Sequence, residues 1–297
     1  MCVKYANRIE SFFKLLSWAE AVKGEDKMET NIVIRNGVEF LLFTYFGLSY
    51  EDSKKTELII RTAVEFAYKD ATNQGAFNAL FTKSAFPDRN RVNSFKNCVK
   101  GMSDIITRAV SALYFGCCSI DFDKWHEALC GELIKEYQEI CKKNNLMVCE
   151  FFTYGNAQKW VNMTIKNLYV ISGAYLAMEV TENKEFFENV ASSSEKYHVP
   201  LDNLILGEIY KQQLTSNQNQ YYVTKHGKKD PNYRITSKAG SYVWSCIPCY
   251  NTYKTFRETL EKAIQEPAIE WECKNWIERK KQIKARKGDL TTIDEKE

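Results

Sequence analysis

Apolar residues recur at helical spacing along most of this chain, and few residues interrupt the pattern. Glycine and proline number only 13 and 5 among 297 residues, which favours long helices over many turns. In the first half, apolar residues three and four positions apart predict five helices, over residues 4–23, 31–47, 57–68, 92–115 and 122–143. The last of these follows Asp121 and contains Asp123, and either aspartate suits an N-cap.

The second half continues the helical pattern but contains one polar stretch. We expect helices over residues 157–179, 182–191, 203–213, 252–266 and 268–287. Residues 215–245 are polar and basic between short aromatic runs, which is typical of either a small β-hairpin or a long basic loop. We predict a mostly α-helical fold in one globular unit. Its helical lobes cover about 1–145 and about 146–297, with a cleft between them.

Composition and charge narrow the class of protein. The net charge is +3, so any basic surface for nucleic acid must be local. The most apolar stretch, 38–48, is too short to span a bilayer and contains Glu39, and residues 1–5 lack a secretory pattern. We therefore expect a cytoplasmic protein without a membrane partner. In that compartment its ten cysteines would be reduced thiols, mostly buried.

A lysine close to a helix start is the first candidate functional residue. Gly155 makes a turn, Asn156 suits the N-cap, and Lys159 then falls at about the third helical position. An ammonium there meets the positive end of the helix dipole, which lowers the pKa of the lysine. The neutral amine is the nucleophilic form that Schiff-base chemistry needs. The same helix end offers backbone N–H groups to a phosphate.

Periodicity divides this helix into two faces. The buried stripe is expected from four residues at helical spacing, Val161, Ile165, Leu168 and Ser172. Lys159, Asn162 and Lys166 share the opposite face. Two interpretations of Lys159 remain open on this basis: a catalytic amine, or an exposed lysine on an amphipathic helix.

The second candidate is an aspartate that follows a short apolar segment. In His198-Val199-Pro200-Leu201-Asp202, the proline disfavours helix at the residue before it, so the segment should be extended. Asp202 then suits the N-cap of a helix that begins near residue 203. The position is also compatible with an ionised carboxylate at the floor of a cleft, and the two interpretations do not exclude each other.

Together these residues resemble a known enzyme family. A glycine turn, the pair Gln158-Lys159 opening an apolar helix, and the later Pro200-Leu201-Asp202 are similar to motifs of the helix-hairpin-helix DNA glycosylases. The archaeal 8-oxoguanine glycosylase branch is the most similar. The resemblance covers residues 154–202, and this chain lacks the compact Leu-Pro-Gly-Val-Gly hairpin of the family.

The resemblance implies a DNA glycosylase, with or without lyase activity, that flips a modified base out of double-stranded DNA. Lys159 would be the amine nucleophile, and Asp202 the carboxylate that stabilises positive charge on the sugar or activates the nucleophile. Such an enzyme would need no cofactor and would serve DNA repair or anti-phage defence. Residues expected to contact substrate or DNA are Gly155, Asn156, Gln158, Asn162, Lys166, His198, Lys228, Lys229 and Arg234.

A non-catalytic helical protein that binds nucleic acid or mediates a host–phage interaction is the alternative. The chain has no Walker-type loop, dinucleotide-binding glycine pattern or Gly-x-Ser-x-Gly motif. Cys246 and Cys249 form a Cys-x-x-Cys pair, but no further ligands stand at short spacing, so a packed turn is favoured over a metal site.

Overall fold

The computed structural model describes residues 27–72, 89–116, 120–143, 152–202, 205–206, 244–264, 266–275 and 278. The helices of this part are α2 (Lys27–Phe46), α3 (Thr56–Thr72), α5 (Arg89–Phe115), α6 (Phe122–Lys143), α7 (Tyr154–Ala177), α8 (Lys184–Ser192) and α10 (Tyr250–Ala263). Short 3-10 helices are η1 (Tyr50–Lys54), η2 (Ser194–Lys196) and η3 (Trp244–Cys246). Residues 268–275 are also helical, and the described residues contain no strand. The mostly α-helical class is confirmed.

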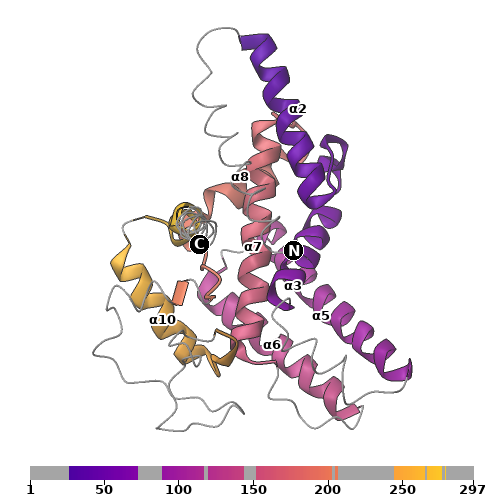
Figure 1. Cartoon of the computed structure of the whole chain (residues 1–297), viewed down its shortest axis with the longest axis vertical. Helices are drawn as coiled ribbons and strands as arrows, with labels where there is room; N and C mark the ends of the chain where they lie inside the picture. Colours follow the sequence, from indigo (N-terminus) through magenta and orange to yellow (C-terminus); the bar gives the residue numbers. More distant parts are fainter. Residues whose placement is uncertain are drawn as a thin grey trace, which may run out of the picture.

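Helix α7 runs through the middle of the molecule (Figure 1). It packs most extensively along α3, and also contacts α6, α8, α2 and η3. Helix α5 packs on α3 and α6. Helices from both halves of the chain therefore share one core around α7. A division into two lobes with a cleft between them stays a prediction.

The sequence of α3 explains how closely α7 approaches it. Ala63 and Ala67 lie one turn apart on the buried face, and their small side chains leave room for the neighbouring helix. Trp160 of α7 is 1% exposed, and its indole N–H donates to the backbone carbonyl of Val64 at 3.0 Å. A large aromatic side chain with a satisfied polar group anchors the two central helices.

Helix α6 has the predicted limits, Phe122–Lys143. Asp121 caps it, since the backbone N–H of Lys124 donates to Asp121 Oδ1 at 3.3 Å. The hairpin or basic loop expected over 215–245 falls largely outside the described residues. Trp244 at its end lies in the short helix η3. None of the helices in the described ranges is both long and apolar enough to cross a membrane.

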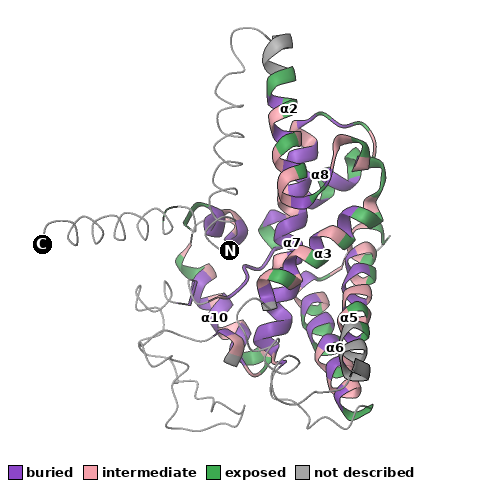
Figure 2. Ribbon diagram, turned by 45° about the vertical axis from the view of Figure 1, so that its right-hand side comes forward, coloured by how far each residue is buried: buried purple, intermediate pink, exposed green. Residues whose placement is uncertain are grey.

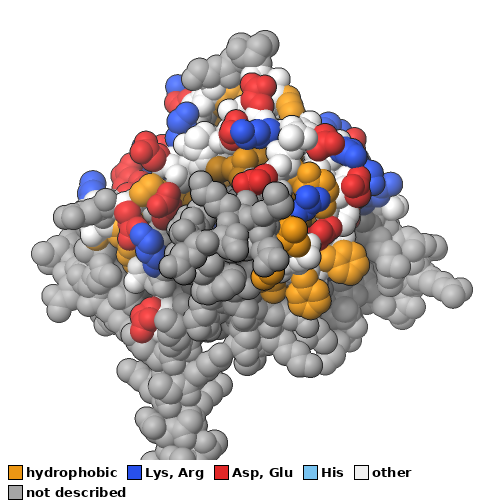
Figure 3. Space-filling view, turned by 90° about the horizontal axis from the view of Figure 1, so that it is seen from above, with side chains coloured by type: hydrophobic (Ala, Val, Ile, Leu, Met, Phe, Trp, Pro, Cys, Tyr) orange, Lys and Arg blue, Asp and Glu red, His pale blue; other side chains and the backbone are white. Residues whose placement is uncertain are grey.

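Burial is uneven over the helices. In Figure 2 the central helix α7 is mostly purple, whereas α2, α5 and α6 alternate between buried and exposed residues. Charged side chains of both signs are interspersed on the described surface seen from above, with hydrophobic side chains between them (Figure 3). The strongly buried helix α7 is also the one that carries Lys159.

Candidate functional site

Helix α7 begins earlier than the sequence suggests. Thr153 is the N-cap, and Asn156 occupies the third helical position of a capping box. The backbone N–H of Thr153 donates to Asn156 Oδ1 at 3.1 Å. The expected N-cap role of Asn156 is therefore wrong. Lys159 lies in the second turn, so the helix dipole acts on it less than expected, because that effect is concentrated in the first turn.

Gly155 is required by a close backbone approach. A Cβ atom at this position would lie 2.0 Å from the carbonyl oxygen of Trp244. The N–H of Gly155 donates to the carbonyl of Ile247 at 3.0 Å. The start of α7 is thus packed directly against η3 and the residues after it, which brings Trp244 to the side of Lys159.

Helix α7 is buried on all sides in its first half, and this overturns the expected division into two faces. Lys159, Asn162 and Lys166, expected on the face opposite the buried stripe, are 7%, 0% and 9% exposed. The residues on this face meet segments from later in the chain. The sequence could not reveal this, because a lysine at helical spacing looks the same in both settings.

The extended segment before Asp202 is fastened to α7 by side-chain amides. Gln158 Nε2 donates to the carbonyl of Leu201 at 3.0 Å, and the N–H of Leu201 donates to Gln158 Oε1 at 3.1 Å. Asn162 Nδ2 donates to the carbonyl of Val199 at 3.1 Å. This pairing sets the register of the segment that leads to Asp202.

The amine of Lys159 lies over an aromatic ring, and two carboxylates influence its pKa. Its Nζ lies 4.3 Å from the centroid of the Trp244 ring. Burial lowers the pKa of Lys159, while the negative charges of Asp202 and Asp70 oppose that shift. Lys159 and Asp202 therefore lie within electrostatic reach of one another. The pKa is lowered in the expected direction, but desolvation is the cause.

Asp202 also has the structural role foreseen for it. Its Oδ1 accepts a hydrogen bond from the N–H of Ile205 at 3.0 Å, and its carbonyl accepts from the N–H of Leu206 at 2.9 Å. Residues 205–206 are helical, so these bonds have the geometry of an N-cap. Capping fixes the position of the carboxylate whose negative charge acts on the pKa of Lys159.

Lys166 forms a buried ion pair that the sequence did not suggest. Its Nζ lies 2.6 Å from Oε1 of Glu272, and the two side chains are 11% and 3% exposed. Burial acts to lower the pKa of Lys166, but attraction to Glu272 outweighs it and the net shift is upward. Burial raises the pKa of Glu272, against the attraction of Lys166. This setting favours a permanent internal cation over the phosphate contact expected for Lys166.

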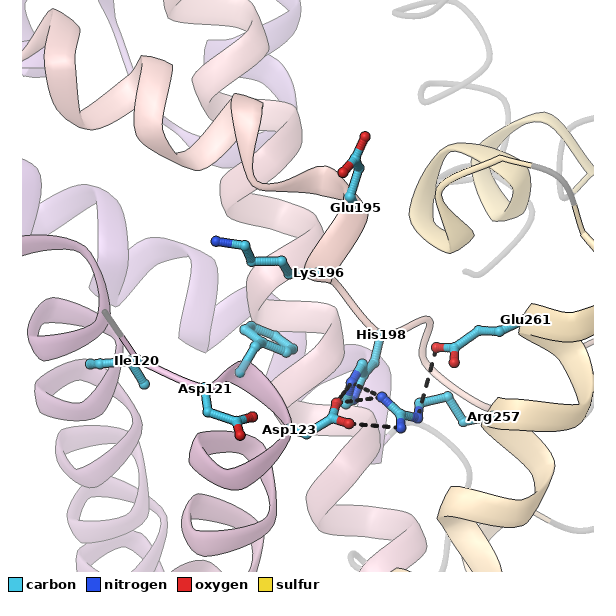
Figure 4. Close-up of a pocket in the computed structure, with 9 residues that line it drawn as sticks. Ile120, Asp121, Asp123, Glu195, Lys196, His198, Arg257 and Glu261 are labelled. Carbon is cyan, nitrogen blue, oxygen red and sulfur yellow. Dashed lines mark hydrogen bonds and ion pairs between the residues drawn. The ribbon is translucent and has the colours of Figure 1, made fainter. Parts of the chain in front are cut away.

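A pocket of about 480 Å³ lies beside the start of α6, where α10 and η2 meet it (Figure 4). Asp123, His198 and Arg257 form a connected group in its wall, and Phe122 and Glu261 also line it. Asp123 Oδ1 lies 2.6 Å from His198 Nε2. Arg257 contacts both residues and also donates through NH2 to Asp123 Oδ2 at 3.0 Å. An arginine that forks onto a carboxylate fixes α10 against α6.

The other ring nitrogen of His198 is held from the opposite side. Asn162 Nδ2 donates to the hydroxyl of Tyr253 at 3.0 Å, and that hydroxyl lies 3.1 Å from His198 Nδ1. Nδ1 of His198 is thus paired with the Tyr253 hydroxyl, and Nε2 with Asp123 and Arg257. Burial lowers the pKa of His198 to about 4, against the effect of Asp123. With both nitrogens engaged, the neutral ring links three segments and is not a free base.

Of the predicted residues, Gly155, Asn156, Gln158, Lys159, Asn162 and Lys166 are in α7, and the segment with His198 and Asp202 is hydrogen-bonded to this helix. Lys228, Lys229 and Arg234 lie outside the described residues. Sequence reasoning missed Glu272, Trp244 and the Asp123–Arg257 pair, whose partners are distant along the chain.

Two further observations bear on the kind of site. Within the described ranges no group of three or more histidine, cysteine or acidic side chains could hold a metal ion. Cys249, from the Cys-x-x-Cys pair, is an exposed thiol at the N-cap of α10. Comparisons with protein-family models, with curated proteins and with solved structures found no match to this chain.

Proposed function

We propose that this chain is a DNA glycosylase in which the amine of Lys159 is the nucleophile and Asp202 is its carboxylate partner. The observation that supports the proposal is the setting of Lys159, a buried lysine of lowered pKa within electrostatic reach of a fixed aspartate. Burial of an amine is a known way to raise the share of its neutral, nucleophilic form. The choice of DNA as substrate comes from the resemblance of residues 154–202 to the helix-hairpin-helix glycosylases.

The chemistry balances with these two residues and solvent. The neutral amine of Lys159 attacks C1′ of the deoxyribose, and the bond from C1′ to the base breaks. Its electron pair leaves with the base, which takes a proton from water. Asp202 stabilises the positive charge on the sugar and accepts the proton lost by the new C–N bond. When the C1′–O4′ bond opens, that proton passes to O4′ and a Schiff base remains on Lys159.

Borohydride trapping tests the proposal. The full-length protein is incubated with duplexes that each carry one modified base or an abasic site, and adducts are identified by mass spectrometry. We expect the wild-type chain to form a covalent adduct with at least one duplex. Lys159→Ala should form none, and neither should Lys159→Met, which keeps an aliphatic side chain over Trp244. Lys184→Ala, an exposed helical lysine, is the matched control and should retain the adduct.

Two outcomes oppose the proposal. An adduct that persists in both Lys159 variants places the nucleophile elsewhere. A folded wild-type chain that forms no adduct with any duplex removes the Schiff-base mechanism. Circular dichroism melting of each variant ensures that a missing adduct reflects lost chemistry and not lost folding.

A non-catalytic helical protein that binds nucleic acid or another protein is the second candidate. The observation that favours it is the seating of Lys159 on the Trp244 ring, since a cation over an aromatic ring also stabilises a core without any reaction. Under this candidate, Lys159→Met changes stability and leaves binding to DNA or to a partner intact. Under the first candidate, the same variant loses adduct formation.

A further inference from the structure

Helix α2 carries large apolar side chains on a face that is open to solvent. Ile32, Val33, Phe40 and Phe43 are 56%, 58%, 67% and 61% exposed. At 100° per residue these four side chains fall within a stripe about 100° wide. We call this the outer stripe of α2.

The opposite side of α2 already forms part of the core. Ile34, Val38, Leu42 and Phe46 are between 0% and 6% exposed and face the rest of the molecule. Helix α2 is therefore apolar on two sides, and only one is covered by the described residues. Single exposed apolar residues are common, but four large ones on one face, interrupted only by Asn36, are typical of a surface that binds a partner.

The outer stripe is complementary to itself. In an antiparallel pair of identical helices, a two-fold axis near residue 37 sets Ile32 opposite Phe43 of the partner subunit. The same axis sets Val33 opposite the partner subunit's Phe40. Each aliphatic residue then meets a ring, and both helices bury the same set of side chains. Such two-fold contacts between identical surfaces are the commonest form of homodimer.

Charges beside the stripe obey the same symmetry. Arg35 and Glu39 lie one turn apart on one flank of it, and the axis near residue 37 sets Arg35 opposite Glu39 of the partner subunit. Both side chains are held in place by Tyr50. The guanidinium of Arg35 lies 3.9 Å from the centroid of the Tyr50 ring. The backbone N–H of Tyr50 donates to Glu39 Oε1 at 2.9 Å. Two equivalent ion pairs would thus form at the rim of the contact.

We propose that α2 is the contact between two copies of this chain, paired antiparallel through the outer stripe. The proposal does not depend on the reaction assigned to Lys159, since that residue is in the interior beside η3. In this dimer the four exposed apolar side chains pack against the same set in the partner subunit, and Arg35 and Glu39 each face a group of opposite charge.

Sedimentation equilibrium of the full chain tests the proposal. Over about 1 to 100 μM, a range that spans weak to moderate homodimers, we expect the wild-type mass to approach that of two chains. Phe40→Glu/Phe43→Glu should raise the dissociation constant at least ~100-fold, because two buried anchors are replaced by charges. Leu58→Glu, at an exposed apolar position of α3, is the matched control and should leave it unchanged.

A charge reversal tests the antiparallel register. Arg35→Glu sets like charges opposite each other and should weaken the dimer about 10-fold, and Arg35→Glu/Glu39→Arg should restore it. A full chain that is monomeric at about 100 μM overturns the proposal, and so does a dimer insensitive to Phe40→Glu/Phe43→Glu. In the first case the stripe does not pair two copies of the chain, and in the second the contact lies elsewhere.

Discussion

The side-chain amide of Gln158 pairs with the backbone of Leu201 through two hydrogen bonds, across a separation of 43 residues. The next residue on each side is Lys159 and Asp202, which are separated by the same interval. The Gln158 amide therefore sets the register of the extended segment along α7. The bonded residues, Gln158 and Leu201, directly precede Lys159 and Asp202 in the sequence. Both bonds are buried, where they cannot exchange with water.

Gln158→Ala should therefore cost far more than a surface truncation. It leaves the N–H and the carbonyl of Leu201 without these partners in the interior, and each unsatisfied group costs about 1–3 kcal/mol. We expect the free energy of unfolding to fall by about 3 kcal/mol, measured by urea denaturation. Asn189→Ala, an exposed amide on α8, is the control and should change it by less than about 0.5 kcal/mol. Equal losses in both variants would contradict the role given to Gln158.

Within the described residues, local rules predicted most of the helices. Helix α6 has the expected limits and the expected aspartate cap, because amphipathic spacing and capping are encoded in adjacent residues. The proline before Leu201 correctly predicted an extended segment that leads to a capping aspartate. The start of α7 was misplaced, because Thr153 and Asn156 both suit a cap and only the structure shows which one accepts the helix N–H groups.

The burial of α7 could not be predicted in the same way. Lys166 is buried where Glu272, 106 residues later in the chain, packs against it. Lys159 is buried where η3 packs against the start of α7 at Gly155. Spacing within one helix reveals which residues share a face, but not what covers that face. The pairing of Lys159 with Asp202 stays a prediction based on a short resemblance. The helix dipole predicts the direction of the pKa shift of Lys159, but desolvation is its main cause.

Gly155→Ala should destabilise the start of α7. The added Cβ would lie 2.0 Å from the carbonyl oxygen of Trp244, so η3 must move away from the helix. We expect a loss of about 2–4 kcal/mol in thermal or urea unfolding, as for overpacked core positions. Gly173→Ala in the same helix has no atom within 4 Å of the new Cβ and should stabilise by about 0.5–1 kcal/mol. Stabilisation by both substitutions would show that the contact with η3 is loose.

The buried pair of Lys166 and Glu272 should show strong coupling. Lys166→Met leaves the carboxylate of Glu272 buried without its cation, which should cost about 3–5 kcal/mol. In Lys166→Met/Glu272→Leu both charges are gone, and most of that loss should be recovered. The exposed pair of Lys184 and Glu188 is the comparison, where Lys184→Met should cost no more than about 0.5 kcal/mol. A double variant no more stable than Lys166→Met would contradict the coupling.

The free energy of unfolding should fall as the pH is lowered from 6.5 to about 4, because in this range His198 is protonated in the unfolded chain but neutral in the folded one. Burial lowers the pKa of His198 from 6.5 to about 4, so the unfolded chain binds more protons between these values. The stabilising contribution is complete above about pH 6.5 and is lost toward pH 4, by about 3 kcal/mol.

His198→Gln is the variant that isolates this effect. Its amide can still donate to Asp123 but cannot take up a proton, so stability should depend less steeply on pH between about pH 7 and 4.5. Some dependence should remain, because burial also lowers the pKa of His126, whose ring centroid lies 4.8 Å from that of His198. Chemical denaturation at a series of pH values measures both slopes. Parallel curves for the two proteins would mean that His198 has the same pKa in the folded and the unfolded chain, which contradicts its lowering by burial.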